Sequence, residues 1–123
     1  MNNMRSNWIE HKGKKIFYQD FSQNFYNAAA VKAELEEVQK VVISTPHNSL
    51  LVLSDFRDTS IAGDLLTAMN MASKATKAHV RKTAVLGITG AKRQLADLLT
   101  RLTGQPLKYF DNIESAKNWL VEE

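Results

Sequence analysis

The residues best suited to chemistry follow an uninterrupted apolar segment, Leu50 to Leu53. A segment of this length and character is typical of a strand that is covered on both faces of a sheet. In open α/β sheets, ligands bind beyond the C-terminal ends of the strands, which is where the next loop is expected to lie. That loop carries carboxylate, guanidinium and hydroxyl groups on Asp55, Arg57, Asp58, Thr59 and Ser60.

Two interpretations of this loop follow from its chemistry. A phosphate on Thr59 or Ser60 would add about two negative charges at the start of the next helix and would change any contact with a partner. Alternatively, Thr59 or Ser60 caps that helix, and Asp58 and Arg57 are only polar neighbours. The first interpretation predicts a phosphorylation or partner-docking site, and the second predicts a structural turn.

A second candidate site follows the predicted strand at 83–88. Thr89, Gly90 and Lys92 stand at the expected start of a helix, where free backbone amides and the helix dipole favour anions. The spacing matches neither a Walker A loop nor a dinucleotide-binding fingerprint. The alternatives are therefore a site for a small anionic ligand and a tight turn from strand to helix.

The histidine and carboxylate residues form no catalytic or metal-binding pattern. Asp20, Asp55 and Asp58 have no nucleophile or histidine base beside them in the sequence. Metal-ligand spacing is also missing between the three histidines, His11, His47 and His79. We therefore expect no catalytic residue, metal or cofactor, which favours a binding protein over an enzyme.

Length, composition and charge limit the class of protein. The 123 residues, 44% hydrophobic and 24% charged, are typical of one globular domain, which we expect to span residues 1–123. The net charge of +3 is small for a nucleic-acid-binding protein, so we expect no nucleic acid. No segment reaches the roughly 20 apolar residues of a membrane span. With no cysteine, the chain fits a reducing compartment, so we expect a cytoplasmic protein, for which a dimer is compatible with the sequence.

Residue patterns predict five strands. Short apolar or alternating segments lie at 8–11, 15–20, 50–53, 83–88 and 107–110. The first two flank Lys12-Gly13-Lys14, where glycine accepts the positive φ of a tight turn, so we expect an antiparallel hairpin. Helices separate the later strands, a pattern that gives parallel strands joined by right-handed crossovers.

About four helices are predicted from apolar residues at three- and four-residue steps. The first is expected to begin at a cap, Ser22 or Asn24, with Phe25 on its apolar face. Asp111 or Asn112 is expected to cap the last one. The helices should lie at about 24–44, 61–79, 90–103 and 112–120. The element order is therefore ββαβαβαβα, an α/β fold with a mixed five-stranded sheet.

Four stretches of the chain resemble a known family. They are Ile16-Phe17-Tyr18-Gln19-Asp20-Phe21-Ser22, Leu53-Ser54-Asp55-Phe56-Arg57-Asp58-Thr59-Ser60, Ala84-Val85-Leu86-Gly87-Ile88-Thr89-Gly90, and Leu107-Lys108-Tyr109-Phe110-Asp111 with Ala116-Lys117-Asn118-Trp119-Leu120. They are similar to the SpoIIAA-like branch of the STAS domains, which is related to anti-sigma-factor antagonists. The resemblance extends over nearly the whole chain and implies a STAS-like fold.

The same resemblance implies a function. In STAS regulators, a strand leads to an Asp-Ser-Ser-Gly sequence that opens a helix, and a partner kinase phosphorylates a serine there to break a protein complex. Asp58-Thr59-Ser60-Ile61 resembles this sequence, with Ser60 in the phospho-acceptor position and isoleucine in place of glycine. The resemblance thus implies a non-enzymatic regulatory or protein-interaction domain of a bacterial type, with a protein partner.

A different class of function stays open beside the regulatory one. The chain could be a carrier of a small molecule or lipid, or an enzyme, with a pocket at the sheet edge near the second and third helices. Leu65, Leu66 and Leu95 would line such a pocket, although the same residues are also expected in the core. The ligand would then be small and apolar or anionic.

Overall fold

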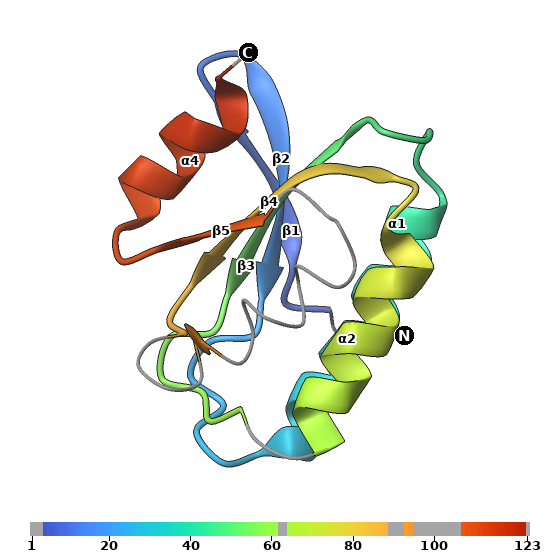
Figure 1. Ribbon diagram of the computed structural model, residues 1–123, viewed down its shortest axis with the longest axis vertical. Helices are drawn as coiled ribbons and strands as arrows, with labels where there is room; N and C mark the ends of the chain where they lie inside the picture. The colour runs from blue at the N-terminus through green and yellow to red at the C-terminus, as the bar shows by residue number, and fades with distance from the viewer. Residues whose placement is uncertain (1–3, 62–63, 89–92, 95–106, 123) are drawn as a thin grey trace.

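A five-stranded sheet with helices on both faces forms the fold (Figure 1). The structure, a computed structural model, describes residues 4–61, 64–88, 93–94 and 107–122. In spatial order the strands are β1 (Asn7–His11), β2 (Lys14–Asp20), β3 (Leu50–Asp55), β4 (Val80–Leu86) and β5 (Leu107–Phe110). β1 is antiparallel to β2, and all other neighbours are parallel, which confirms the predicted mixed sheet.

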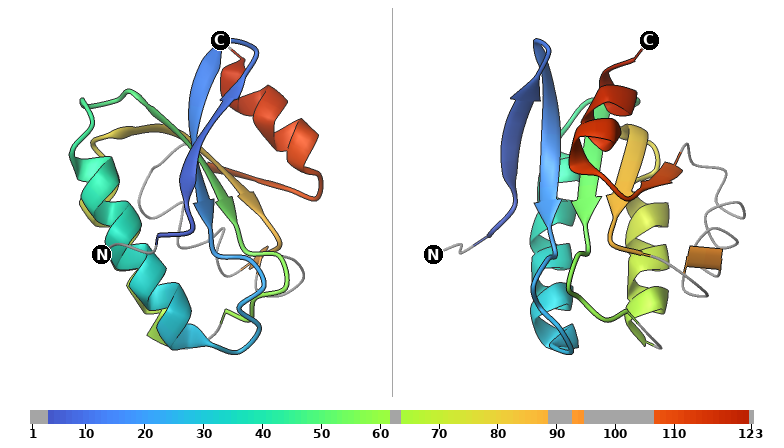
Figure 2. Two further views of the ribbon diagram at one scale, coloured as in Figure 1. Left: turned by 180° about the vertical axis from the view of Figure 1, so that it is seen from behind. Right: turned by 90° about the vertical axis from the view of Figure 1, so that its left-hand side faces the viewer.

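The described residues contain three helices, where about four were predicted. They are α1 (Ala28–Ile43), α2 (Asp64–Thr76) and α4 (Ile113–Val121). α1 and α2 pack together on one face of the sheet, and α4 covers the other face (Figure 2). The predicted helix at 90–103 lies outside the described residues, apart from Arg93 and Gln94, which are helical.

A two-residue turn connects β1 and β2 in an antiparallel hairpin. His11 is paired with Lys14, so only Lys12 and Gly13 connect the strands. Both have positive φ, 51° and 81°, the combination that matches the twist of a two-residue turn. Gly13 adopts this conformation without strain, which explains its place in the turn.

The first helix begins later than predicted. Its N-cap is Asn27, whose side-chain oxygen accepts a hydrogen bond from the backbone of Ala30, and not Ser22 or Asn24. Phe25 is 62% exposed, so it is not part of the buried face of α1. Its spacing from Ala28 and Val31 fits a helix, but hydrogen bonds with the backbone of Asp58 and Ser60 hold it outside the helix. For the last helix, Asn112 is the cap, one of the two residues expected.

Two cores lie on the two faces of the sheet. Every residue of β3 is buried, as expected for a strand covered on both faces. Alternate side chains enter different cores because successive residues of a strand point to opposite faces. The core beneath α1 and α2 includes Phe17, Phe21, Val31, Val38, Val52 and Leu65. The core beneath α4 contains Ile16, Leu51, Leu53, Ala84, Leu86, Ala116 and Leu120.

Two lysines attach the C-terminal end of α4 to the sheet. The ammonium of Lys14 on β2 donates a hydrogen bond to the carbonyl of Val121 (3.1 Å). The ammonium of Lys82 on β4 donates to the carbonyls of Trp119 (2.9 Å) and Glu122 (2.8 Å). The last carbonyls of a helix lack partners within the helix and carry the negative end of its dipole, so both lysines stabilise this end.

Replacing Lys82 tests this attachment. We expect Lys82→Met to lower the free energy of unfolding by about 1–2 kcal/mol, because two carbonyls lose a charged donor. Urea unfolding followed by circular dichroism measures the change. Lys74→Met, at an exposed position on α2, is the matched control and should change stability by less than about 0.5 kcal/mol. Equal effects of the two substitutions would contradict the role assigned to Lys82.

Candidate functional site

Two loops at the C-terminal edge of the sheet are joined by backbone hydrogen bonds. Residues 21–27 follow β2, and residues 55–60 begin at the end of β3; we call them the paired loops. Their hydrogen bonds continue the parallel pairing of β2 with β3 beyond the ends of both strands. The N–H of Phe21 donates to the carbonyl of Asp55 (2.9 Å), and the N–H of Gln23 donates to the carbonyl of Arg57 (2.8 Å). The N–H of Phe25 donates to the carbonyl of Asp58 (2.8 Å), and the N–H of Ser60 donates to the carbonyl of Phe25 (2.6 Å).

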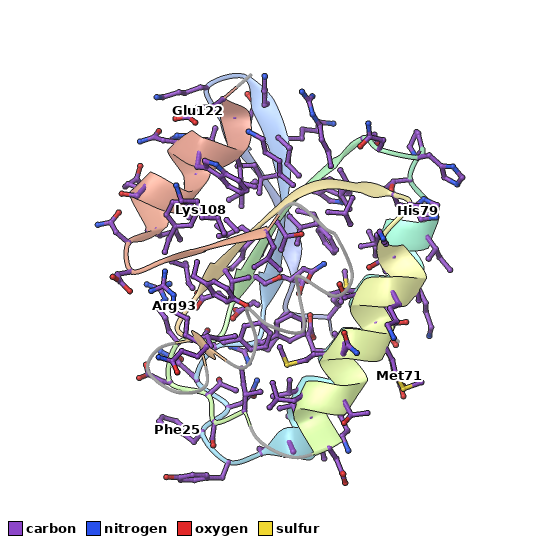
Figure 3. All side chains as sticks on the ribbon, in the orientation of Figure 1. Phe25, Met71, His79, Arg93, Lys108 and Glu122 are labelled. Carbon is purple, nitrogen blue, oxygen red and sulfur yellow. The ribbon has the colours of Figure 1, made fainter. Side chains whose placement is uncertain are left out.

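The paired loops contain strained backbone. Gln23, Phe25 and Asp58 have φ of 57°, 50° and 57°, in the left-handed region that residues other than glycine seldom adopt. Each such residue costs on the order of 1 kcal/mol, and the hydrogen bonds between the loops hold them there. This backbone path leaves Phe25 62% and Tyr26 90% exposed. Figure 3 shows Phe25 at the end of the molecule opposite to Glu122.

The carboxylate of Asp55 anchors the second loop. Its side chain is completely buried at the end of β3, the central strand. The phenol of Tyr18 on β2 donates a hydrogen bond to one oxygen (2.6 Å). Arg57 donates to the carboxylate from its backbone N–H (3.0 Å), from Nε (3.0 Å) and from Nη2 (2.7 Å). The carboxylate therefore fixes the turn from Asp55 to Arg57 and ties it to the neighbouring strand.

The electrostatics of this group favour fixed protonation states. Burial raises the pKa of Asp55, but the hydrogen bonds from Arg57 and Tyr18 outweigh it, so the pKa lies below its ordinary value. Burial, together with the hydrogen bond to Asp55 and the charge of that carboxylate, raises the pKa of Tyr18 well above its ordinary value. The hydrogen bond to Asp55 raises the pKa of Arg57. All three groups keep their protons or their charge near neutral pH, so they suit a structural role better than proton transfer.

The hydroxyl of Thr59 joins the paired loops. It donates a hydrogen bond to the carbonyl of Phe21 (2.6 Å) and accepts one from the backbone N–H of Asn24 (3.1 Å). The described part of α2 begins at Asp64, and residues 62–63 directly before it lie outside the described residues. The hydroxyl of Thr59 has its partners in the other loop, and the interpretation of Thr59 or Ser60 as a helix cap stays a prediction. The local sequence could not show that Thr59 has its partners in a loop 35 residues away.

The second candidate site lies outside the described residues. Thr89, Gly90 and Lys92, the predicted anion-binding residues, all belong to a segment that the structure does not describe. The neighbouring Arg93 is described, and its guanidinium donates a hydrogen bond to the carbonyl of Tyr109 (3.2 Å). It also lies 3.8 Å from the carboxylate of Asp111.

Gly87, directly after β4, is a residue of the site that the sequence patterns did not reveal. Its φ is +88°, and a Cβ at this position would lie 2.4 Å from the backbone nitrogen of Arg57 and 2.5 Å from the carbonyl carbon of Phe56. The backbone N–H of Phe56 also donates a hydrogen bond to the carbonyl of Leu86 (2.8 Å). A glycine is therefore required where the turn that holds Asp55 crosses the end of β4. The available signal was a glycine within a strand-like segment, which often marks a close approach of two backbones.

A cavity of about 140 Å³ lies between the sheet and the two helices α1 and α2. Leu66 lines it, as expected for a pocket, whereas Leu65 is part of the core, and Leu95 lies outside the described residues. The sequence had placed a pocket at the sheet edge, near the second and third helices. The described cavity lies over the face of the sheet beneath α1 and α2 and reaches the edge strand β5 at Leu107 and Tyr109. The third helix lies outside the described residues, so a pocket beside it stays a prediction.

A comparison with protein-family models matches residues 16–121 to the SpoIIAA-like family. The chain belongs to this family. Comparisons with the curated proteins and with the solved structures found no match to the chain. None of the helices that the structure describes is long and apolar enough to cross a membrane. The described part of this SpoIIAA-like protein also has no group of three or more histidine, aspartate or glutamate residues placed to hold a metal ion.

The close approach at Gly87 predicts a large effect of a single methyl group. We expect Gly87→Ala to lower the free energy of unfolding by about 3 kcal/mol, because the methyl group overlaps backbone atoms and alanine is strained at positive φ. Thermal or urea unfolding measures the change. Gly13→Ala is the matched control, since Gly13 has a similar φ but open space around it. The control should lose only about 1 kcal/mol, and equal losses would show that the contact with Arg57 is unimportant.

The lowered pKa of Asp55 predicts a pH-dependent contribution to stability. Because the pKa is lower in the folded state than in the unfolded one, this contribution is complete above the unfolded pKa of about 4 and is lost as the pH falls through the folded pKa. At pH 7, Asp55→Asn should lower the free energy of unfolding by about 2 kcal/mol, because charged hydrogen bonds are lost. The difference from the wild type should shrink at acid pH, as measured by urea unfolding between about pH 7 and pH 2.

Asp58→Asn is the control for this measurement. Asp58 is an exposed carboxylate in the same loop, and asparagine tolerates its positive φ, so the change should stay within about 0.5 kcal/mol. A difference between wild type and Asp55→Asn that does not vary with pH would contradict the charged state assigned to Asp55.

Proposed function

We propose that this SpoIIAA-like protein is a non-enzymatic regulatory domain that binds a partner protein through the paired loops. The supporting observation is the exposure of Phe25 and Tyr26 on a backbone that hydrogen bonds hold in place. Aromatic side chains are enriched at the centres of protein interfaces. A docking surface that is already ordered loses little conformational entropy when the partner binds.

Arg57 adds a polar element to this surface. Its side chain is 51% exposed, while its guanidinium is hydrogen-bonded to the buried Asp55. Arginine is, with the aromatic residues, among the types that contribute most to binding energy at interfaces. Phe25, Tyr26 and Arg57 thus combine two exposed aromatic rings with a positioned cation, a composition suited to protein docking.

Ser60 is the position from which we propose that docking is regulated. Its backbone N–H donates a hydrogen bond to the carbonyl of Phe25 (2.6 Å), so a phosphate on Ser60 would lie beside the aromatic part of the surface. About two added negative charges there would oppose the burial of apolar side chains against a partner. Thr59 is less suited to modification because its hydroxyl holds the two loops together. The lack of cysteine supports a cytoplasmic setting for this interaction.

Quantitative affinity capture from the native cell tests the proposal. Phe25→Ser and Tyr26→Ser should each reduce the recovery of the partner at least about 10-fold, because truncated aromatic anchors at interfaces commonly cost more than 1 kcal/mol. Met71→Ser is the matched control, since Met71 is 66% exposed but lies on α2. Recovery is measured by mass spectrometry after cross-linking. If no protein depends on Phe25 or Tyr26 for its recovery, the docking proposal is wrong.

The same capture tests the role of Ser60. Ser60→Asp should reduce recovery of that partner, and Ser60→Ala should leave it unchanged, because only aspartate adds a negative charge beside Phe25. Circular dichroism and thermal unfolding verify that both variants fold. Equal recovery with the two variants would remove Ser60 from the proposal while leaving the docking surface intact.

A further inference from the structure

The cavity between the sheet and the helices has polar side chains on the sheet and a largely apolar lining around them. Gln19, Ser54 and Thr83, on the three adjacent strands β2, β3 and β4, all line it and are only 9%, 7% and 9% exposed. Apolar side chains such as Val52 and Met69 line other parts of the same cavity. Buried polar groups cost free energy unless they are hydrogen-bonded, so three of them on the core face of a sheet require partners.

Hydrogen bonds within the described residues satisfy these three side chains only in part. The hydroxyl of Ser54 donates to the side-chain oxygen of Gln19 (3.1 Å). Within the described residues, the amide nitrogen of Gln19 has no hydrogen-bond partner, although it carries two donors. Every side-chain nitrogen or oxygen that is fully buried in the described part of the chain does have a partner. The Gln19 amide is therefore open to the cavity that it lines.

The size and charge of the cavity restrict its occupant. In another protein, a cavity of about 150 Å³ lined by apolar side chains binds benzene, and the cavity here has about 140 Å³. None of the described residues that line it carries a formal charge. An ionised carboxylate or phosphate would lose hydration and gain no counter-charge from these described residues, at a cost of several kcal/mol.

We infer that this cavity is a binding site for a small uncharged molecule with an apolar body and one hydrogen-bonding group, such as a carbonyl. The carbonyl accepts a hydrogen bond from the Gln19 amide, and the body packs between the sheet and Met69 of α2. This site lies apart from the docking residues Phe25, Tyr26 and Arg57, none of which lines the cavity. The inference is therefore independent of the proposed regulatory function.

Benzamide is a suitable probe because it combines a benzene ring with a neutral carbonyl, and benzoate is its charged counterpart of nearly the same shape. With methionine methyl groups labelled with carbon-13, benzamide should shift the NMR signal of Met69 in a saturable way. The signal of Met71, exposed on the same helix, should not move. At pH 7, benzoate should bind at least about 10-fold more weakly, because burial of its charge is uncompensated.

Gln19→Met keeps the size of the side chain and removes the amide, so it isolates the polar contact. We expect the affinity for benzamide to fall about 10-fold in this variant, while benzene, which does not use the amide, still binds. Ala72→Leu, at a buried position that lines the cavity, should reduce binding of both compounds by filling the space. Thermal unfolding verifies that the variants fold.

Three results would overturn the inference: no shift of Met69 with benzamide or benzene, which indicates a cavity that holds only water; equal binding of benzoate; or unchanged benzamide binding by Gln19→Met. Phe25→Ser should bind benzamide like the wild type, since its side chain does not line the cavity. Failure of the cavity inference and failure of the docking proposal are thus distinguished by separate measurements.

Discussion

The structure of the paired loops depends on the buried carboxylate of Asp55. A buried charge is unfavourable unless it is fully hydrogen-bonded, and here Tyr18 and Arg57 both donate to it. This requirement fixes the turn after β3, brings β2 and β3 together at their ends, and aligns the two loops that follow them. It also brings the backbone of Arg57 against Gly87, so that the end of β4 tolerates no side chain there.

Successive side chains of β3 point to opposite faces of the sheet, and this separates the cavity from the hydrogen bonds that hold the paired loops. Asp55 contacts Tyr18 and Arg57, whereas the preceding residue, Ser54, lines the cavity beneath α1 and α2. The cavity and the paired loops share one wall, formed by Phe21 and Phe56, whose rings are stacked with centroids 4.8 Å apart. Phe21 also donates the first hydrogen bond between the loops, to the carbonyl of Asp55. One aromatic pair thus supports both the cavity and the proposed docking surface.

The sequence predicted those features that depend on local patterns. The apolar run of β3, the glycine turn of the hairpin and the alternation of strands and helices are each encoded within a few residues. Periodicity placed Phe25 in a helix because it cannot detect the hydrogen bond from Phe25 to Asp58, which lies 33 positions away in the sequence. The role of Tyr18 depends in the same way on the register of β2 against β3. Such contacts between distant segments decide the site, and one sequence does not reveal them.

The backbone conformation of the paired loops lowers the stability of the fold. Three residues in left-handed conformations cost on the order of 1 kcal/mol each, and Phe25 and Tyr26 gain little from burial because both are largely exposed. The hydrogen bonds between the loops, the hydroxyl of Thr59 and the anchoring of Arg57 on Asp55 help to offset this strain. Strained backbone persists where surrounding contacts over-determine it, and such places cluster at functional sites. A partner that covers the two aromatic rings would supply the apolar burial that the isolated domain lacks.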